Sequence, residues 1–205
     1  MNIVPIAREI AALAQTGRHF TENPYDRERY ERLQQIAAEM LASSSNLEPG
    51  VIHEWNKAEF GYATPKVDVR AFVLREGRVL LVRENSDGGR WTLPGGWADV
   101  NQAPSESAAR EVMEESGYTV RVVRLLAVWD RDRRGHTPPH PYHVFKIFFL
   151  CELTGGEPRP NLESSECGFF DVNELPELSL ARTLESEVRT LYEMVQTGDT
   201  EARFD

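Results

Sequence analysis

The N-terminal part of the chain carries apolar side chains at the spacing of an α-helix. Ile6, Ile10 and Leu13 fall on one face of a predicted helix, and Gly17 is expected to end that helix. The spacing therefore predicts an α-helix in this segment.

A second helix is predicted in the segment NPYDRERYERLQQIAAEMLA, where Asn23 can cap the helix and Pro24 suits its first position. One face of this helix is lined by Tyr30, Leu33, Ala37 and Met40. The segment EPGVIHEWNKAEFGY indicates a third, shorter helix. Residues 1–62 are therefore expected to form a small all-helical domain.

After the segment ATPK the pattern changes from helices to strands. VDVRAFVL alternates apolar and polar positions, EG supplies a turn, and RVLLVRE follows as a hairpin partner. TVRVVRLLAVWD and HVFKIFFLCEL indicate two further strands, and ARTLESEVRTLYEMVQ indicates a closing amphipathic helix. The apolar face of that helix holds Leu184, Val188, Leu191 and Val195. Residues 63–205 are expected to form one mixed α/β domain.

Charge and cysteine usage limit the partners and the compartment. The 205 residues include 33 Asp and Glu against 23 Lys and Arg, a net charge of −10 at pH 7. That balance disfavours broad electrostatic binding to nucleic acid or anionic lipid. The N-terminus lacks a signal-peptide pattern, and the longest apolar stretch contains Lys146 and is too short to span a membrane. With Cys151 and Cys167 expected as reduced core residues, we predict a cytoplasmic protein without a membrane partner.

A helix rich in glutamate is predicted between the strands. Pro104 suits its first position and Gly117 its C-cap, and Glu111, Glu114 and Glu115 then share one face. Like charges at this spacing destabilise a helix by roughly 0.2–0.5 kcal/mol per pair. A hard divalent cation would offset the repulsion, and the preceding segment LPGG offers a backbone carbonyl to the same ion.

The acidic face also suits a solvated helix held by ion pairs. Arg110 lies four residues from both Glu106 and Glu114, which is the spacing of such pairs. The order of glycine loop, arginine and glutamate triad favours the cation site over this alternative.

Residues 96–118 resemble the Nudix box, which has a glycine, a spaced glutamate, an Arg-Glu pair, an apolar residue, a Glu-Glu pair and a glycine at fixed intervals. Gly96 opens the match, and REVMEESGY, starting at Arg110, completes it. Gln102 stands where the family has its first glutamate. Its amide can accept a hydrogen bond from Arg110 without charge assistance, and Glu106 is expected to supply the missing charge.

The resemblance implies a Nudix α/β/α sandwich with a mixed sheet, preceded by the small all-helical domain. AQTGRHFTENPYDRERYERLQQIAAEMLA, PYHVFKIFFLCEL and ECGFFDVNELPELSLAR are similar to a subgroup whose members hydrolyse nucleoside diphosphates linked to another group. Within it, the resemblance favours hydrolysis of CDP-choline to CMP and phosphocholine. ADP-ribose, an RNA end, or a non-catalytic role in nucleotide sensing stay open as alternatives.

The resemblance also implies which residues form the site. The metal ligands are expected to be the Gly96 carbonyl, Glu111, Glu114 and Glu115, with Mg²⁺ or Mn²⁺ as the cofactor. That ion would bind the diphosphate and acidify a water molecule. Arg110 and Glu111 are expected to take part in catalysis. The general base is expected to be Glu166, with Glu163 as the second candidate and Glu111 as an alternative within the helix.

Substrate contacts are predicted from isolated cations and aromatic residues. Arg70 is a cation in an apolar strand, Arg131 opens a local basic loop, and Trp97 and Trp91 flank the glycine segment. Each has a plain alternative, as an outward strand residue, a solvated loop residue or a core aromatic. The same loop carries His136, His140 and His143, and its prolines exclude a helical metal site.

The expected partner is a small nucleotide, and RNA is not favoured. A homodimer is also predicted, because Nudix proteins are commonly dimers and three short helices bury little core of their own.

Overall fold

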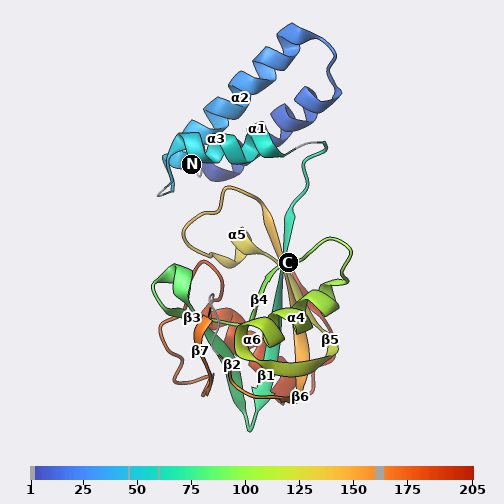
Figure 1. Cartoon of the computed structure of the whole chain (residues 1–205), viewed down its shortest axis with the longest axis vertical. Helices are drawn as coiled ribbons and strands as arrows, with labels where there is room; N and C mark the ends of the chain where they lie inside the picture. Colours follow the sequence, from blue (N-terminus) through green and yellow to red (C-terminus); the bar gives the residue numbers. More distant parts are fainter. Residues whose placement is uncertain (1–2, 46, 60, 160–163) are drawn as a thin grey trace. The chain divides into compact units, whose positions relative to one another are not determined.

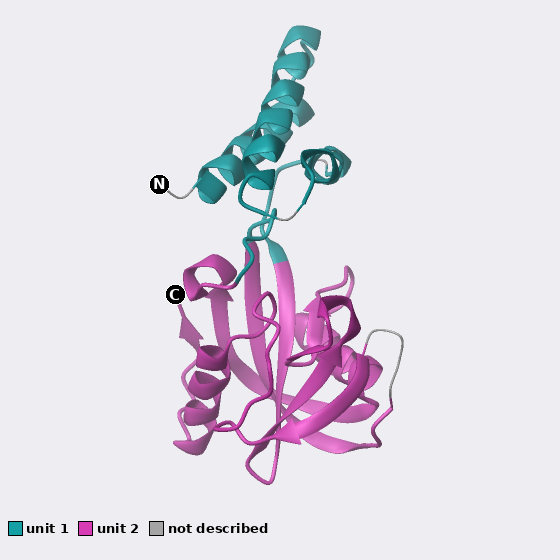
Figure 2. Ribbon diagram, turned by 90° about the vertical axis from the view of Figure 1, so that its left-hand side faces the viewer, with its two compact units in different colours: residues 1–66, 137–143 teal, residues 67–136, 144–205 magenta. Residues whose placement is uncertain are grey.

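The computed structural model divides the chain into two compact units (Figure 2). One unit combines residues 1–66 with 137–143, and the other combines residues 67–136 with 144–205. The structure describes residues 3–45, 47–59, 61–159 and 164–205.

Three helices form the first unit, coloured blue to cyan in Figure 1. They are α1 (Ile3–Phe20), α2 (Pro24–Ala42) and α3 (Pro49–Ala58). The Asn23 side chain accepts a hydrogen bond from the backbone N–H of Tyr25 at 2.9 Å, and Pro24 opens the helix. The predicted start of α2 is therefore confirmed, and its cause is local capping.

Gly17 does not end α1, which continues to Phe20. A Cβ atom at residue 17 would lie 2.3 Å from the ring of Tyr30 in α2. The glycine is thus required by packing, because the Tyr30 ring takes the space of a side chain. The predicted helix stop was wrong, since sequence spacing alone does not separate a stop from a close helix contact.

The helices of this unit meet through small side chains. The core of the unit contains Val4, Ala7, Ala38, Leu41 and Ile52. On α2 the buried side chains are Gln34, Ala37, Ala38 and Leu41. Of the predicted apolar face, Ala37 is buried, whereas Leu33 is exposed. The inward face is rotated towards the alanines because small residues let two helices approach closely.

The proline-rich loop 137–143 belongs to the helical unit rather than to the sheet. Arg8 donates a hydrogen bond from Nε to the His140 carbonyl oxygen at 2.9 Å. The rings of Trp55 and Tyr142 stack with centroids 6.3 Å apart, and the Lys66 N–H donates to the His143 carbonyl at 2.9 Å. The first unit is therefore completed by a segment from far along the chain.

The second unit is built on one mixed sheet. Its strands are β1 (Lys66–Arg75), β2 (Arg78–Glu84), β3 (Arg90–Thr92), β4 (Gly95–Trp97), β5 (Tyr118–Asp130), β6 (Val144–Gly156), β7 (Ser164–Phe170) and β8 (Arg203–Phe204). The order is β3-β2-β1-β6-β5-β8, with β4 paired to β1 and β7 to β2. The predicted β1–β2 hairpin and the long β5–β6 partners are antiparallel, whereas β5 and β8 are parallel.

Side chains along the central strands alternate between two cores. Phe72 and Leu81 belong to one buried cluster, and their neighbours Val73 and Leu80 belong to the other. Because successive strand residues point to opposite faces, the two clusters lie on opposite sides of the sheet. Helix α4 (Pro104–Ser116) adds Val112 to the second core. Helix α6 (Glu185–Gln196) adds to the first core Val188, Leu191 and Met194. The predicted sandwich with a helical N-terminal part is confirmed.

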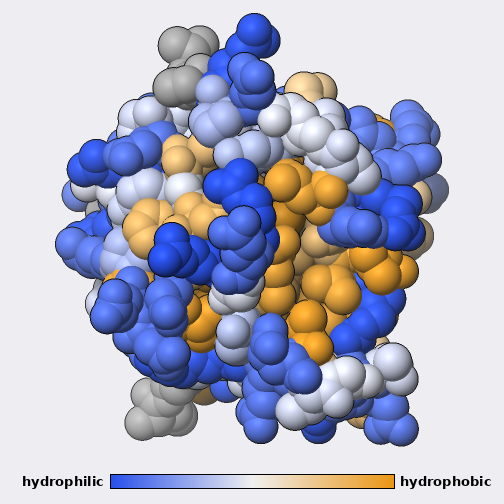
Figure 3. All heavy atoms as spheres, turned by 90° about the horizontal axis from the view of Figure 1, so that it is seen from below, coloured by the Kyte–Doolittle hydropathy of each residue, from blue (hydrophilic) through white to orange (hydrophobic). Residues whose placement is uncertain are grey.

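The surface keeps some apolar side chains among many charged ones. Figure 3 shows one face of the molecule, where hydrophobic residues lie in patches between hydrophilic ones. Exposed apolar atoms are normal for a folded protein, so spacing and neighbours decide whether a patch has a role. In the part of the chain that the structure describes, no helix is long and apolar enough to cross a membrane.

Candidate functional site

Two glutamates of α4 flank a glycine strand in the second unit. The helix opens at Pro104 and ends at Ser116, and the left-handed conformation of Gly117 confirms the predicted C-cap. One turn apart on it, Glu111 and Glu115 approach β4. Glu115 accepts a hydrogen bond from the backbone N–H of Gly95 at 2.8 Å. The Glu111 carboxylate lies 3.2 Å from the position of a Cβ atom on Gly96.

Glycine is required at residue 95 by close contact with β1. Its φ is 146°, and a Cβ atom there would lie 2.0 Å from the carbonyl oxygen of Val69. β4 pairs antiparallel with β1, so that Arg70 lies opposite Gly95 and Val69 opposite Gly96. The sequence LPGG thus forms a short strand that brings bare backbone next to two carboxylates.

Burial perturbs both carboxylates of this pair. Burial raises the pKa of Glu115 to about 8, although Arg70 and the Gly95 N–H act in the opposite direction. Burial also raises the pKa of Glu111, while Arg110 lowers it. Glu111 and Glu84 each contribute a like charge near Glu115. The pair is therefore an acidic site in which negative charge is unfavourable without a compensating cation.

Arg110 connects α4 to the segment before it. Its guanidinium donates to Glu111 at 2.7 Å and to Asp99 at 2.9 Å, and it also pairs with Glu114. The predicted hydrogen bond to Gln102 is present, from Nε at 3.1 Å. The planar group thereby fixes both the start of the helix and the orientation of Glu111.

Asp99, rather than Glu106, supplies the negative charge beside Arg110. Glu106 instead turns back and accepts from the backbone N–H of Ala103 at 2.9 Å, which caps α4. The prediction for Glu106 was wrong because its carboxylate satisfies a free helix N–H. Asp99 was missed because it lies in the loop before the helix, where no periodic spacing relates it to Arg110.

The arrangement fits a divalent cation held by carboxylates and backbone. Among residues 3–45, 47–59, 61–159 and 164–205, no three His, Cys, Asp or Glu side chains come together as a metal-ligand set. Two carboxylates, Glu111 and Glu115, do meet the Gly95–Gly96 backbone, and oxygen donors are what hard divalent cations prefer. Glu114 pairs with the Arg110 guanidinium that also holds Glu111, and its charge raises the pKa of Glu111. A ligand role for Glu114 thus requires that it share or leave Arg110.

A buried ion cluster lies behind the glycine strand. Arg70 donates to both carboxylate oxygens of Asp68, at 2.9 and 2.7 Å, and Lys146 donates to Asp68 at 2.8 Å. Burial alone would raise the pKa of Asp68, but the two cations outweigh it and hold that pKa well below its usual range. Arg70 also donates to the carbonyl oxygen of Leu93 at 3.0 Å. The cluster therefore ties β1 and β6 to the segment that leads into β4.

Arg70 is thus neither an outward strand residue nor solvent-accessible. It is buried, its N–H groups meet protein acceptors, and it contributes positive charge near Glu115 and Glu111. The structure gives this cation a place behind the acidic pair.

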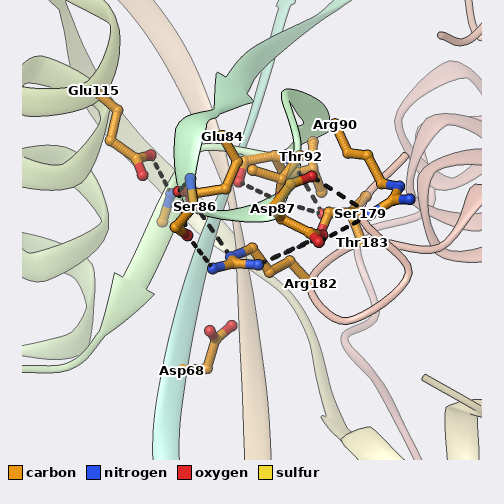
Figure 4. A network of polar contacts seen from close by, with 12 residues as sticks. Asp68, Glu84, Ser86, Asp87, Arg90, Thr92, Glu115, Ser179, Arg182 and Thr183 are labelled. Carbon is orange, nitrogen blue, oxygen red and sulfur yellow. Dashed lines mark hydrogen bonds and ion pairs between the residues drawn. The ribbon is translucent and has the colours of Figure 1, made fainter. Parts of the chain in front are cut away.

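Figure 4 shows a second polar network, which joins the 179–183 segment to the loop after β2. Thr183 contacts the Thr92 hydroxyl at 2.8 Å and accepts from the Leu93 N–H at 3.1 Å. Arg182 pairs with Glu84 at 3.4 Å and donates to Ser86 at 3.0 Å. These contacts fix the position of the residues that precede β4. They were not predicted because about ninety residues separate the partners.

Glu166 lies on a strand rather than in a loop. It belongs to β7, opposite Arg83 of β2, and pairs with that residue at 3.4 Å. Both side chains are largely exposed. Glu163, the second candidate base, lies outside the described residues.

The other predicted substrate residues differ in exposure. Trp97 is exposed on β4. Trp91 packs edge-on against Phe170, with ring centroids 4.7 Å apart. Arg131 opens the short helix α5 (Arg131–Arg134) and is buried, and its Nε donates to the Ala181 carbonyl at 3.3 Å. Trp97 is therefore accessible to solvent, whereas Trp91 and Arg131 are held by protein contacts.

His136 is a buried residue and not a solvated loop residue. One ring nitrogen lies 3.0 Å from the Leu180 carbonyl, and the other lies 2.8 Å from the carboxylate of Glu187. Its ring and the Glu187 side chain are fully buried. The histidine therefore fixes the segment after α5 against α6. His140 and His143 belong to the helical unit.

Comparison with known families divides the chain close to the boundary, near residue 66, between the two compact units. Residues 1–55 match a family described as a UDP-X-like, N-terminal oligomerisation domain, and residues 64–193 match the NUDIX domain. The second match covers more than half of the chain and includes α4, β4 and the Arg110 network.

Curated relatives and solved structures agree with these matches. A putative ADP-ribose pyrophosphatase, YjhB of Bacillus subtilis, is 42% identical over 97% of this chain and 95% of its own length. An ADP-ribose pyrophosphatase of Methanocaldococcus jannaschii is 33% identical over 58% of this chain and 69% of its own length.

Two crystal structures resemble the chain over different lengths. A UDP-X diphosphatase is 34% identical, with a TM-score of 0.63, over 98% of this chain and 97% of that one. An ADP-ribose pyrophosphatase from Streptococcus suis is 39% identical, with a TM-score of 0.63, over 69% of this chain and 100% of that one. By its box, its sandwich fold and these relatives, the chain belongs to the Nudix family of hydrolases.

Proposed function

We propose that this Nudix hydrolase cleaves the diphosphate bond of a nucleoside diphosphate linked to a second group, and that it requires a divalent cation. The observation that carries the proposal is the pair formed by half-buried Glu111 and buried Glu115 beside the Gly95–Gly96 backbone. A bound cation would stabilise these two neighbouring carboxylates. The same cation would reduce the repulsion between an anionic diphosphate and an acidic protein.

ADP-ribose and CDP-choline are the two substrates that we propose. The printed names of relatives in B. subtilis and M. jannaschii support ADP-ribose. The sequence resemblance across both domains supports CDP-choline, which would yield CMP and phosphocholine. An RNA end is disfavoured by the net charge of −10. A purely sensory role is disfavoured because Arg110, Glu111, Glu114 and Glu115 are all present, although Gln102 replaces the first glutamate of the box.

Glu111, Glu115 and the Gly96 carbonyl would hold the cation, with Glu114 as a further ligand. We propose Mg²⁺, with Mn²⁺ as the alternative. When bound, a divalent cation supplies charge neutralisation for the diphosphate and a more acidic water.

The protein's own residues would orient the reaction. Arg110 fixes the Glu111 carboxylate through its 2.7 Å contact, so that one oxygen is held and the other stays directed at the glycine strand. The Glu111 carboxylate is thereby placed beside the glycine strand, where it would accept a proton from the attacking water. Glu166 is the alternative base, and it would first have to leave Arg83. Trp97 is exposed on β4 and offers a face on which a base can stack.

The helical unit is proposed to make the enzyme a homodimer. Its match to an oligomerisation domain supports this, as does the small core that three helices provide.

Product analysis tests the proposed reaction. The protein is incubated with ADP-ribose, CDP-choline, a nucleoside triphosphate and a short RNA, each in ¹⁸O-water with Mg²⁺, Mn²⁺ or EDTA. We expect one or both diphosphate-linked substrates to yield two phosphate monoesters, one of them labelled, and no product with EDTA. Exclusive turnover of the RNA, or turnover that EDTA leaves unchanged, would contradict the proposal.

A matched pair of variants locates the site. Glu111→Gln should lower kcat by about 100-fold or more, the range of a lost general base. Glu106→Gln is the control, because Glu106 caps the same helix and stands outside the acidic pair. Equal losses in both variants would show that helix stability, and not the site, had changed.

A further inference from the structure

Arg182 is an arginine of the second unit whose side chain still meets solvent. That side chain is 30% exposed, whereas the side chains of Arg70 and Arg131 are 4% and 5% exposed. The two arginines that the sequence predicted as substrate contacts are therefore enclosed by protein. A protein with a net charge of −10 needs a local positive group to attract an anionic substrate, and Arg182 is exposed enough to supply one.

The protein uses only part of the hydrogen-bonding capacity of Arg182. Its guanidinium donates to the hydroxyl oxygens of Ser86 at 3.0 Å and Ser179 at 3.4 Å. The carboxylates of Glu84 and Asp87 approach its nitrogens only to 3.4 and 3.7 Å, compared with about 2.7–2.9 Å for a close charged pair. A guanidinium carries more N–H donors than these contacts among the described residues use, so it can also donate to a bound ligand.

The carboxylates beside Arg182 have other donors. One oxygen of Glu84 accepts from the N–H of Ser86 at 3.1 Å and from its hydroxyl at 2.7 Å. Asp87 accepts from the hydroxyl of Ser179 at 2.6 Å. If Arg182 turns towards a bound anion, each carboxylate keeps a hydrogen bond, and neither is left without a donor.

The backbone of this segment places Arg182 next to the acidic pair. Thr183 accepts from the Leu93 N–H at 3.1 Å, two residues before the glycine strand begins. Glu84 pairs with Arg182 and also lies close enough to Glu115 for their negative charges to interact. Figure 4 shows Glu84 between Arg182 and Glu115. The guanidinium therefore borders the place where the cation and the diphosphate would meet.

We propose that Arg182 binds the diphosphate of the substrate, on the Glu84 side of the cation site. A guanidinium presents parallel N–H groups that match two oxygens of one phosphate, and charge-assisted hydrogen bonds of this kind fix the orientation of the group. The hydroxyls of Ser86 and Ser179 hold the guanidinium in place before the substrate arrives. This role rests on the proposed function, because it adds a residue that binds the same diphosphate.

The test combines kinetics with binding of a diphosphate that cannot be cleaved. Arg182→Gln removes the charge and keeps a side chain that can donate to the serine hydroxyls. With the better of ADP-ribose and CDP-choline, its KM should rise by about 10- to 100-fold, the range of a lost hydrogen bond to a charged group. Its kcat should change less, because Arg182 holds the substrate and transfers no proton. Calorimetry with the α,β-methylene analogues of ADP and CDP, in Mg²⁺, should show a matching rise in Kd.

Arg90→Gln is the matched control. Arg90 belongs to the same polar network and also pairs with Asp87, but its other ion pair is with Glu177 and its side chain is 44% exposed. We expect parental KM and Kd in this variant. Equal losses in Arg90→Gln and Arg182→Gln would show that the network as a whole had changed, and would overturn the proposal.

The two measurements separate this proposal from the proposed function. Turnover by the parent with unchanged KM and Kd in Arg182→Gln would overturn the role of Arg182 and leave the hydrolase reading intact. An Arg182-dependent Kd in a parent that turns over neither substrate would support the role of Arg182 and contradict the hydrolase reading. A parent that binds neither analogue overturns the proposal.

Arg182→Lys decides the case in which Arg182→Gln has a lower melting temperature than the parent. Lysine keeps the positive charge and lacks the planar pair of donors, so we expect a smaller rise in KM and Kd, by about 10-fold. Parental KM and Kd in an Arg182→Lys variant with the parental melting temperature would overturn the proposal that the guanidinium grips the diphosphate.

Discussion

The stability of the metal-free protein should depend on pH through Glu115. Burial raises the pKa of this carboxyl from 4.5 to about 8. Each pKa unit corresponds to about 1.4 kcal/mol, so ionised Glu115 destabilises the folded protein by about 5 kcal/mol. Between these two pKa values the folded protein keeps a proton that the unfolded chain releases. The free energy of unfolding should therefore fall as pH rises, by up to about 1.4 kcal/mol per pH unit from this group.

The variant Glu115→Gln removes this titration and keeps an oxygen that can accept from the Gly95 N–H. Between about pH 5 and pH 8, we expect the free energy of unfolding of this variant to fall less than that of the parent. Urea unfolding in EDTA at four pH values measures the difference between the two proteins. Glu106→Gln serves as the control, because its carboxylate caps the helix away from the acidic pair.

The difference between parent and Glu115→Gln is the decisive quantity, since groups away from the acidic pair titrate equally in both. A difference that stays constant across the pH range would refute the assignment of a raised pKa to Glu115. Saturating Mg²⁺ should flatten the pH dependence of the parent more than that of the variant, because a bound cation favours the ionised Glu115 carboxylate.

Three further outcomes are expected. Asp68→Asn should lower the free energy of unfolding by about 3–5 kcal/mol, because it leaves Arg70 buried without its carboxylate, and urea unfolding measures this. Thr183→Val should lower stability by about 1–3 kcal/mol, since the buried Leu93 N–H loses its acceptor, and an exposed threonine changed to valine is the control. Arg110→Lys should lower kcat with little change in the melting temperature, because an ammonium cannot replace the planar contacts of the guanidinium.

The parts of the site that the sequence predicted are those set by neighbouring residues. Pro104 and Gly117 bound α4 as expected, and the spacing of Glu111 and Glu115 places both on the side of the glycine strand. The hydrogen bond between Gln102 and Arg110 was also predicted, since the two residues are close in the sequence. Local spacing and capping were sufficient for these features.

The remaining features depend on contacts between distant segments. The different surroundings of Glu114 and Glu115 are set by β4, which covers one side of α4 and not the other. The Asp68–Lys146 ion pair joins two strands, and no spacing rule connects its members. The requirement for glycine at residue 17 also depends on a contact between segments, because the Tyr30 ring that occupies the space of its side chain lies on another helix.

The most direct test of the proposed site measures cation binding and turnover in the same proteins. Mn²⁺ affinity is titrated by electron paramagnetic resonance for the parent, Glu111→Gln and Glu106→Gln, and kcat with the better of ADP-ribose and CDP-choline is measured on each. We expect Glu111→Gln alone to lose both cation affinity and turnover. Parental Mn²⁺ affinity and turnover in Glu111→Gln would contradict a catalytic cation site at the Glu111–Glu115 pair.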